Sequence, residues 1–212
     1  MNSSRQDEHE TLETLFKNID LSIAQQQLLG CYHTTGPGRP PRNPIGILRA
    51  FIVMQMKAIR SIRELTRILD VDQRIRRLCL IKKDEGAYPR SVLSRFTHRV
   101  GAETLQLIIE EKVAWLLRRS GVTEVDVVLD ASFIKAWSIR DPADNRKGLS
   151  DPDARVGRSG RGFDLGYKLH TSVEPKCILP LATLLASANE NEKRHAPSLV
   201  ERSRLVLGRA GV

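Results

Sequence analysis

The chain has 212 residues, of which 41% are hydrophobic and 28% charged, a balance typical of a folded globular protein and not of a disordered one. Its longest mainly apolar run, residues 177–188, is shorter than the roughly 18 residues that a membrane-spanning helix needs. We therefore expect no membrane partner. Three scattered cysteines match neither a disulfide framework nor a zinc site and favour a location in the reducing cytoplasm.

The net charge of +9 is concentrated in the middle of the chain. Residues 39–119 hold 18 basic and 8 acidic side chains, whereas the net charge is −3 before them and +2 after them. A concentrated positive field attracts polyanions, of which nucleic acid is the commonest. The alternative is a surface whose charge only maintains solubility. We favour nucleic acid.

Helical patterns fill the first half of the chain. We predict one helix over residues 10–29, followed by the Pro- and Gly-rich stretch 36–44, which cannot be helical. Asn43 and Pro44 suit the N-cap and the first position of the next helix. Another helix begins at Ser61, with an acidic residue three positions later to complete a capping box.

Two further breaks divide the helices that follow. A short helix is expected over residues 72–80, and Ser91 caps a helix that Gly101 ends. The stripe of apolar residues in the next segment predicts a helix over 102–119. We thus expect an N-terminal helical segment over residues 1–35 and an all-helical domain over residues 36–120.

After residue 120 the pattern changes to that of strands. Residues 125–130 read as a buried strand, residues 138–165 as a long polar loop, and residues 167–173 and 178–187 as two more strands. A final helix is expected over 197–207. The overall expectation is an α+β protein, in which residues 121–212 form an incomplete α/β domain.

Asp130 is the strongest candidate for chemistry in this second half. A carboxylate at the end of a buried strand must be paired or bind a cation; the alternative is that it caps the following turn. Ser132 lies near it, and Lys168 and His170 share one face of the next strand. If the apolar face of that strand packs on the helix, these two side chains project to the far side. A Ser132–His170–Asp130 triad is conceivable, but the nucleophile elbow of such enzymes is missing.

The helices between residues 43 and 101 resemble a DNA-reading unit. The pair over 61–80 followed by the basic helix 91–100 gives a helix-turn-helix-like succession, with a bundle bearing a solvated basic face as the alternative. The side chains expected to contact DNA are Arg39, Arg42, Arg60, Arg63, Arg90, Arg95, His98 and Arg99. For the segment of Arg39 we favour a plain linker, with insertion of Arg39 into a minor groove as the alternative.

Together these features resemble the DDE transposases of bacterial insertion sequences, in the insertion-sequence four/five-like superfamily. Four stretches carry the resemblance: GRPPRNPIGILRAFIV (38–53), YPRSVLSRFTHRVG (88–101), VVLDASFIKAWS (127–138), and DPDARVGRSGRGFDLGYKLHTSVE (151–174) with its sequel LPLATLLASANENEKRHAP (179–197). They span nearly everything from residue 36 onward.

The resemblance implies an RNase H-like catalytic core that holds two Mg²⁺ or Mn²⁺ ions between three carboxylates and cuts and joins DNA strands. Asp130 matches the first carboxylate, which makes it the expected catalytic and metal-binding residue, and Ser132, Lys168 and His170 match positions near it. The implied partners are the double-stranded terminal repeats of an element and further transposase subunits. A nucleoid-associated location in the cytoplasm follows.

The chain departs from the family in one respect. It ends at Val212, before the positions of the second and third carboxylates, so we expect a C-terminally truncated or frame-split transposase that is inactive alone. A second polypeptide or a full-length transposase would complete it. The alternatives are a catalytically dead DNA-binding regulator of transposition and, much less favoured, an unrelated hydrolase that uses Asp130 and His170.

Overall fold

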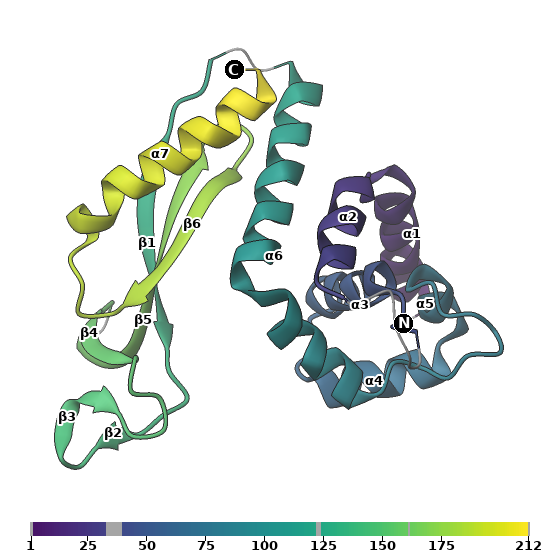
Figure 1. Cartoon of the computed structure of the whole chain (residues 1–212), viewed down its shortest axis with the longest axis horizontal. Coiled ribbons are helices and arrows are strands. Elements are labelled where there is room, and N and C mark those ends of the chain that lie inside the picture. The colour runs from purple at the N-terminus through teal and green to yellow at the C-terminus, as the bar shows by residue number, and fades with distance from the viewer. Residues whose placement is uncertain (1, 33–39, 122–123, 161, 212) are drawn as a thin grey trace. The chain divides into compact units, whose positions relative to one another are not determined.

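The computed structural model describes residues 2–32, 40–121, 124–160 and 162–211. The chain divides into two compact units, Met1–Ile108 and Ile109–Val212, the first helical and the second built on an antiparallel sheet (Figure 1). The mixed α+β content agrees with the expected fold class. The division falls inside a helix, earlier than the residue 120 that the sequence suggested. Among the described residues, no helix is both long and apolar enough to cross a bilayer.

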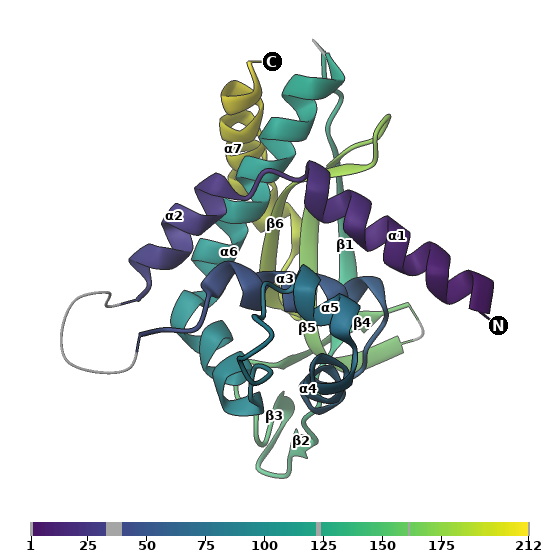
Figure 2. The same ribbon diagram turned by 90° about the vertical axis from the view of Figure 1, so that its right-hand side faces the viewer.

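The helical unit contains α1 (Asn2–Asn18), α2 (Ser22–Gly30), α3 (Pro44–Met56), α4 (Ile62–Val71), α5 (Gln73–Leu78) and the first part of α6 (Arg90–Ser120). The single helix predicted over 10–29 is wrong, because the chain turns between α1 and α2, which diverge in Figure 2. At this turn the Asp20 carboxylate accepts a hydrogen bond from the backbone N–H of Ser22.

Two of the predicted helix starts in this unit are confirmed, whereas the Ser91 cap is wrong, because α6 begins at Arg90 and Ser91 lies inside it. The Asn43 side chain accepts a hydrogen bond from the backbone of Ile45 at 3.0 Å, and Pro44 is the first residue of α3. The Ser61 hydroxyl accepts one from the backbone of Glu64 at 3.1 Å and caps α4. Caps are local interactions, which explains why the sequence was sufficient to place them.

One apolar core holds the helical unit together. Leu12 and Phe16 of α1 and Leu28 of α2 are buried in the same cluster as Ile45 of α3 and Leu93 of α6. Helices α1 and α2, which lie in the segment expected to be separate, therefore share a core with the helices that follow.

Gly101 interrupts α6, as its predicted role as a helix end requires. Its φ of 73° and ψ of 167° are not helical, and a glycine adopts such a positive φ without the steric cost that a Cβ imposes. The helical path resumes after it and runs to Ser120.

The second unit is built on an antiparallel sheet of β1 (Val128–Lys135), β2 (Arg140–Asp141), β3 (Asp144–Gly148), β4 (Arg155–Ser159), β5 (Gly162–Glu174) and β6 (Leu179–Ser187). The long strand β5 is central: β1 pairs with one side of it, and β4 and β6 pair with successive parts of the other. β3 and β2 extend the sheet beyond β4 (Figure 1).

Two sequence predictions for this unit are wrong. The expected loop over 138–165 contains β2, β3 and β4, short polar strands whose ladder rests on backbone hydrogen bonds and leaves no apolar alternation to detect. The strand expected over 125–130 starts at Val128, continues past Asp130 to Lys135, and is largely exposed instead of buried. In the described part of the chain β1 pairs with β5 alone, which makes it an edge strand.

Helix α7 (Glu192–Ala210) packs across the sheet (Figure 1). It is capped by Asn191 and begins at Glu192, five residues before the Pro197 start that the sequence indicated. Its apolar side joins the last turns of α6 and β6 in a second core of Val113, Ala114, Leu117, Leu181, Val206 and Ala210.

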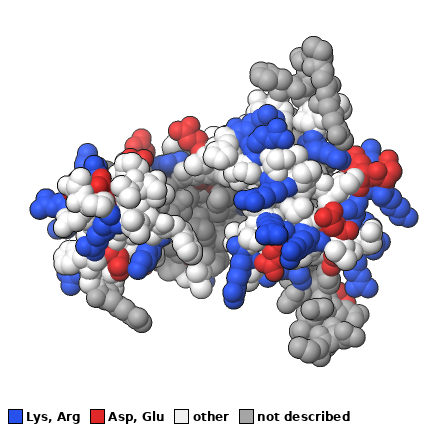
Figure 3. Space-filling view, turned by 90° about the horizontal axis from the view of Figure 1, so that it is seen from below, with Lys and Arg blue, Asp and Glu red and all other residues white. Residues whose placement is uncertain are grey.

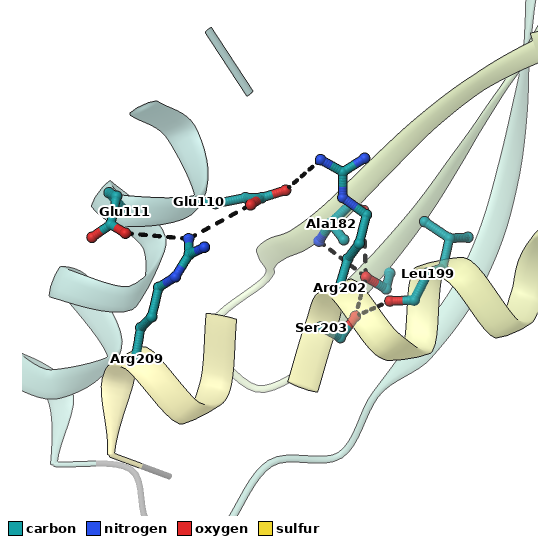
Figure 4. A network of polar contacts seen from close by, with 8 residues as sticks. Glu110, Glu111, Ala182, Leu199, Arg202, Ser203 and Arg209 are labelled. Carbon is teal, nitrogen blue, oxygen red and sulfur yellow. Dashed lines mark hydrogen bonds and ion pairs between the residues drawn. The ribbon is translucent and has the colours of Figure 1, made fainter. Parts of the chain in front are cut away.

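Ion pairs connect α6 to α7 beside this core (Figure 4). The buried Glu110 carboxylate lies 3.1 Å from Arg202 and 3.7 Å from Arg209, and Arg209 also reaches Glu111 at 3.2 Å. The Glu110 Oε1 atom contacts Arg202 without the alignment of a hydrogen bond, so charge attraction supplies most of this contact.

Candidate nucleic-acid interface and carboxylate site

Basic side chains gather on one face of the helical unit. In Figure 3 the helical unit, on the right, shows far more Lys and Arg surface than Asp and Glu surface. Of the side chains expected to contact DNA, six are exposed in the helical unit, namely Arg60, Arg63, Arg90, Arg95, His98 and Arg99. Arg39 lies outside the described residues.

A groove within this unit brings three of the expected arginines together. Arg42, Arg95 and Arg99 line a cavity of about 370 Å³ together with Tyr32. The Arg99 guanidinium lies 4.7 Å from the centre of the Tyr32 ring, a cation–π distance, and Arg42 pairs with Glu85 at 3.3 Å. Sequence reasoning missed Tyr32, because it lies far from the basic helix in the chain and follows a different helix.

One arginine of this region is buried and stabilises the fold instead of contributing to the basic surface. Arg76 is 8% exposed, and its guanidinium donates to the backbone oxygens of Leu69 at 3.0 Å and Glu85 at 2.6 Å. These bonds tie α5 to the end of α4 and to the segment after it. Part of the positive charge of residues 39–119 is therefore structural.

In the sheet unit, the polar face of β5 packs against α7. The pattern predicted the reverse, with Lys168 and His170 projecting away from the helix. The helix instead offers a polar partner to each polar strand residue, in the pairs Lys168–Glu192 at 3.0 Å, His170–His195 with ring centres 4.7 Å apart, and Ser172–Ser203 at 2.7 Å. Hydrogen bonds or opposite charges compensate the burial of the Lys168 and Ser172 side chains, whereas His170 and His195 meet through their rings.

Asp130 and His170 lie on opposite faces of the sheet. Asp130 is directly opposite Thr171 in the β1–β5 register, and His170 is opposite Ala131; directly opposite residues of an antiparallel pair project to the same face. Ser132 shares the face of Asp130. This arrangement rules out the Ser132–His170–Asp130 triad and the hydrolase hypothesis built on it.

A cavity of about 210 Å³ at the sheet edge nevertheless borders both residues. Asp130 and Ala131 of β1 line it together with His170 and the first turns of α7, including Glu192. Sequence reasoning missed Glu192, because its contact with Lys168 depends on how the helix packs on the strand.

His170 is a buried base beside this cavity. Burial lowers the pKa of its imidazole, and the neighbouring His195 and Lys168 lower it further, while Glu192 and Glu190 act in the opposite direction. Its Nε2 atom has no hydrogen-bond partner among the described residues. The imidazole is therefore neutral at pH 7.

The residues around Asp130 do not by themselves make a two-metal centre. The carboxylate is exposed, and its Oδ1 atom accepts a hydrogen bond from the Ala131 backbone at 2.8 Å. Within the described residues no group of three His, Cys, Asp or Glu side chains is placed to hold a metal ion. Asp130 thus offers one ligand, and two bridged ions require several carboxylates.

Comparison with known protein families links the helical unit to transposition. Residues 2–99 match a family described as Transposase domain (DUF772). The match supports a transposase family for this chain. No curated protein and no solved structure shows a significant match.

The transposase-domain match and the carboxylate site lie in different parts of the chain. The match ends at residue 99, within the first part of α6, so it includes the basic face and the arginine groove. Asp130 and the whole sheet lie beyond it.

Proposed function

We propose that this chain acts in DNA transposition as a transposase of the DDE type, and that its helical unit binds the double-stranded ends of an insertion element. The observation that carries the proposal is the transposase-domain match over residues 2–99. The helical unit that it covers presents the exposed arginines of α4 and α6, which have the charge and hydrogen-bond donors that DNA phosphates require.

The DNA-binding part is tested by fluorescence anisotropy with the whole chain and mixed-sequence duplexes over a range of salt concentrations. Binding to phosphates releases counterions, so the affinity should fall linearly in a logarithmic plot against salt. Substituting Arg60 and Arg63 with Gln should weaken binding and reduce the slope by about 1 for each lost phosphate contact.

A matched control removes one positive charge from the other unit. Arg204→Gln changes an exposed residue of α7 and should leave duplex affinity within about twofold. If the double variant binds as tightly as the Arg204 variant, or if affinity is independent of salt, the helical unit is not the DNA-binding part.

For the catalytic part, we propose that Asp130 is the first of a set of Mg²⁺- or Mn²⁺-binding carboxylates. Two bound ions would supply the activation of water or a 3′-hydroxyl and the stabilisation of the leaving oxygen. The other ligands would come from outside the residues grouped around Asp130; a second polypeptide or another transposase subunit of an oligomer is one source.

This view predicts that residues 1–212 alone do not cut DNA. Incubation with supercoiled plasmid and Mn²⁺ should produce no more nicked circle than the Asp130→Asn variant does, as measured on agarose gels. Nicking by the wild-type chain that the Asp130 substitution abolishes would show that the chain carries a complete site.

The isolated carboxylate also favours a second candidate function, a DNA-binding regulator that occupies element ends without cutting them. Salt-dependent binding combined with the absence of nicking is its expected signature. Nicking dependent on Asp130 would exclude it.

A further inference from the structure

The arginine groove of the helical unit combines an apolar floor with a basic rim. Its lining includes Ile47 and Phe96, which are 1% and 2% exposed, and Val92, which is half-buried. Arg95 and Arg99 are exposed at its edge. A volume of about 370 Å³ falls within the range of pockets that hold small organic groups.

The charges around the groove favour an anion. The lining contains three arginines and no acidic side chain, and the nearby Glu85 is already engaged with Arg42. Arg95 and Arg99 are four residues apart on α6, which places them on the same helix face. A phosphate at the rim would therefore face two guanidinium groups from one rigid element.

The aromatic ring of Tyr32 adds a stacking surface. The Arg99 guanidinium lies over it at 4.7 Å, and burial raises the pKa of the Tyr32 hydroxyl, so this group stays a neutral hydrogen-bond donor at pH 7. Stacked rings and guanidinium planes are the surfaces on which proteins hold unpaired bases.

We propose that this groove binds one unpaired nucleotide of DNA, with the base against Tyr32, Pro89 and Val92, above the buried Ile47 and Phe96, and its phosphate at Arg95 and Arg99. A basic rim alone would attract any duplex, but the apolar side chains of the groove can stabilise only a base that is no longer stacked in the duplex. The inference rests on the proposed DNA-binding function and adds to it a preference for DNA ends with unpaired bases.

The test measures the affinity of the whole chain for a blunt duplex and for the same duplex with a short single-stranded overhang carrying 2-aminopurine. Stacking of one base corresponds to a change in affinity of about 5- to 150-fold. The overhang duplex should bind at least about fivefold more tightly, and 2-aminopurine fluorescence should change on binding. Equal affinity for the two duplexes overturns the groove proposal and leaves duplex binding standing, whereas no binding to either overturns both.

Two variants separate the groove from general electrostatics. Val92→Trp fills the groove without changing charge and should abolish the overhang preference while blunt-duplex affinity is retained. Arg99→Gln, at an exposed position, should reduce overhang affinity more than blunt affinity. Its matched control is Arg74→Gln, an exposed charge on α5 outside the groove, which should reduce both affinities by the same factor. If the Arg99 and Arg74 variants behave alike, the groove does not hold the nucleotide.

Discussion

His170 connects the stability of the sheet unit to pH. Its side chain is 2% exposed between β5 and α7, and burial together with His195 lowers its pKa in the folded state. The unfolded chain, where histidine titrates near about 6.5, therefore binds the proton more readily. Stability is complete above that value and declines as the pH falls from about 6.5 toward the folded-state pKa.

Replacing His170 with Gln should flatten this decline, because the titrating group is removed. The measurement is urea unfolding at a series of pH values between 7.5 and 5, followed by tryptophan fluorescence. Both tryptophans, Trp115 and Trp137, belong to the sheet unit, so the signal reports that unit. His98→Gln, on an exposed position of the helical unit, serves as the control. An unchanged pH slope in the His170 variant would contradict the prediction.

At the scale of elements, the position of α7 against α6 depends on a buried carboxylate. Glu110 is 5% exposed and faces both Arg202 and Arg209. Removing one member of a buried ion pair is more costly than losing a surface pair, because the remaining charge loses its compensation. Both arginine side chains are 35% exposed, so water compensates part of that loss.

We expect Glu110→Ala to lower the free energy of unfolding of the sheet unit by about 1–3 kcal/mol. Glu111→Ala is the matched control. In the ion pairs described, Glu111 contacts only Arg209, which it shares with Glu110, and its side chain is more exposed than that of Glu110. This substitution should lower the free energy of unfolding by less than about 1 kcal/mol. Urea unfolding followed by tryptophan fluorescence measures both. Equal losses in the two variants would show that burial of Glu110 carries no special weight.

The elements also show which parts of this fold the sequence could predict. The starts of α3 and α4 were predictable, because Asn43 and Ser61 act on backbone groups two or three residues away. The face that β5 turns toward α7 was not, because the partner of Ser172 is Ser203, far along the chain. In the candidate site, the sequence predicted Asp130 at the end of a strand, whereas the structure has it near the start of β1. Its separation from His170 could be seen only from the β1–β5 register.

At the scale of the whole molecule, β1 presents an exposed edge. In the part of the chain that the structure describes, this strand pairs with β5 alone. Val127, Val128 and Leu129 at its start are 38–51% exposed. Exposed apolar edge strands are sites at which another strand adds to a sheet.

Val128→Lys should therefore slow self-association of the chain, because a charge on an edge strand opposes strand addition. The measurement is light scattering at fixed protein concentration over time. Val71→Lys is the control, since it adds the same charge at an exposed position at the end of α4 and should have little effect. Faster or equal aggregation of the Val128 variant relative to this control would argue that the edge is not the point of association.

The polar contacts between β5 and α7 also fix the position of the helix along the strand. Apolar surfaces can slide past one another with a small change in energy, whereas a hydrogen bond such as Ser172–Ser203 exists at one position of the helix only. A slip of α7 by one residue would break this bond, at about 0.5–1.5 kcal/mol, although Ser172 would keep its hydrogen bonds to Ala182 and Ser203 its bond to Leu199. The strand beside Asp130 is thereby held in a single alignment with its helix.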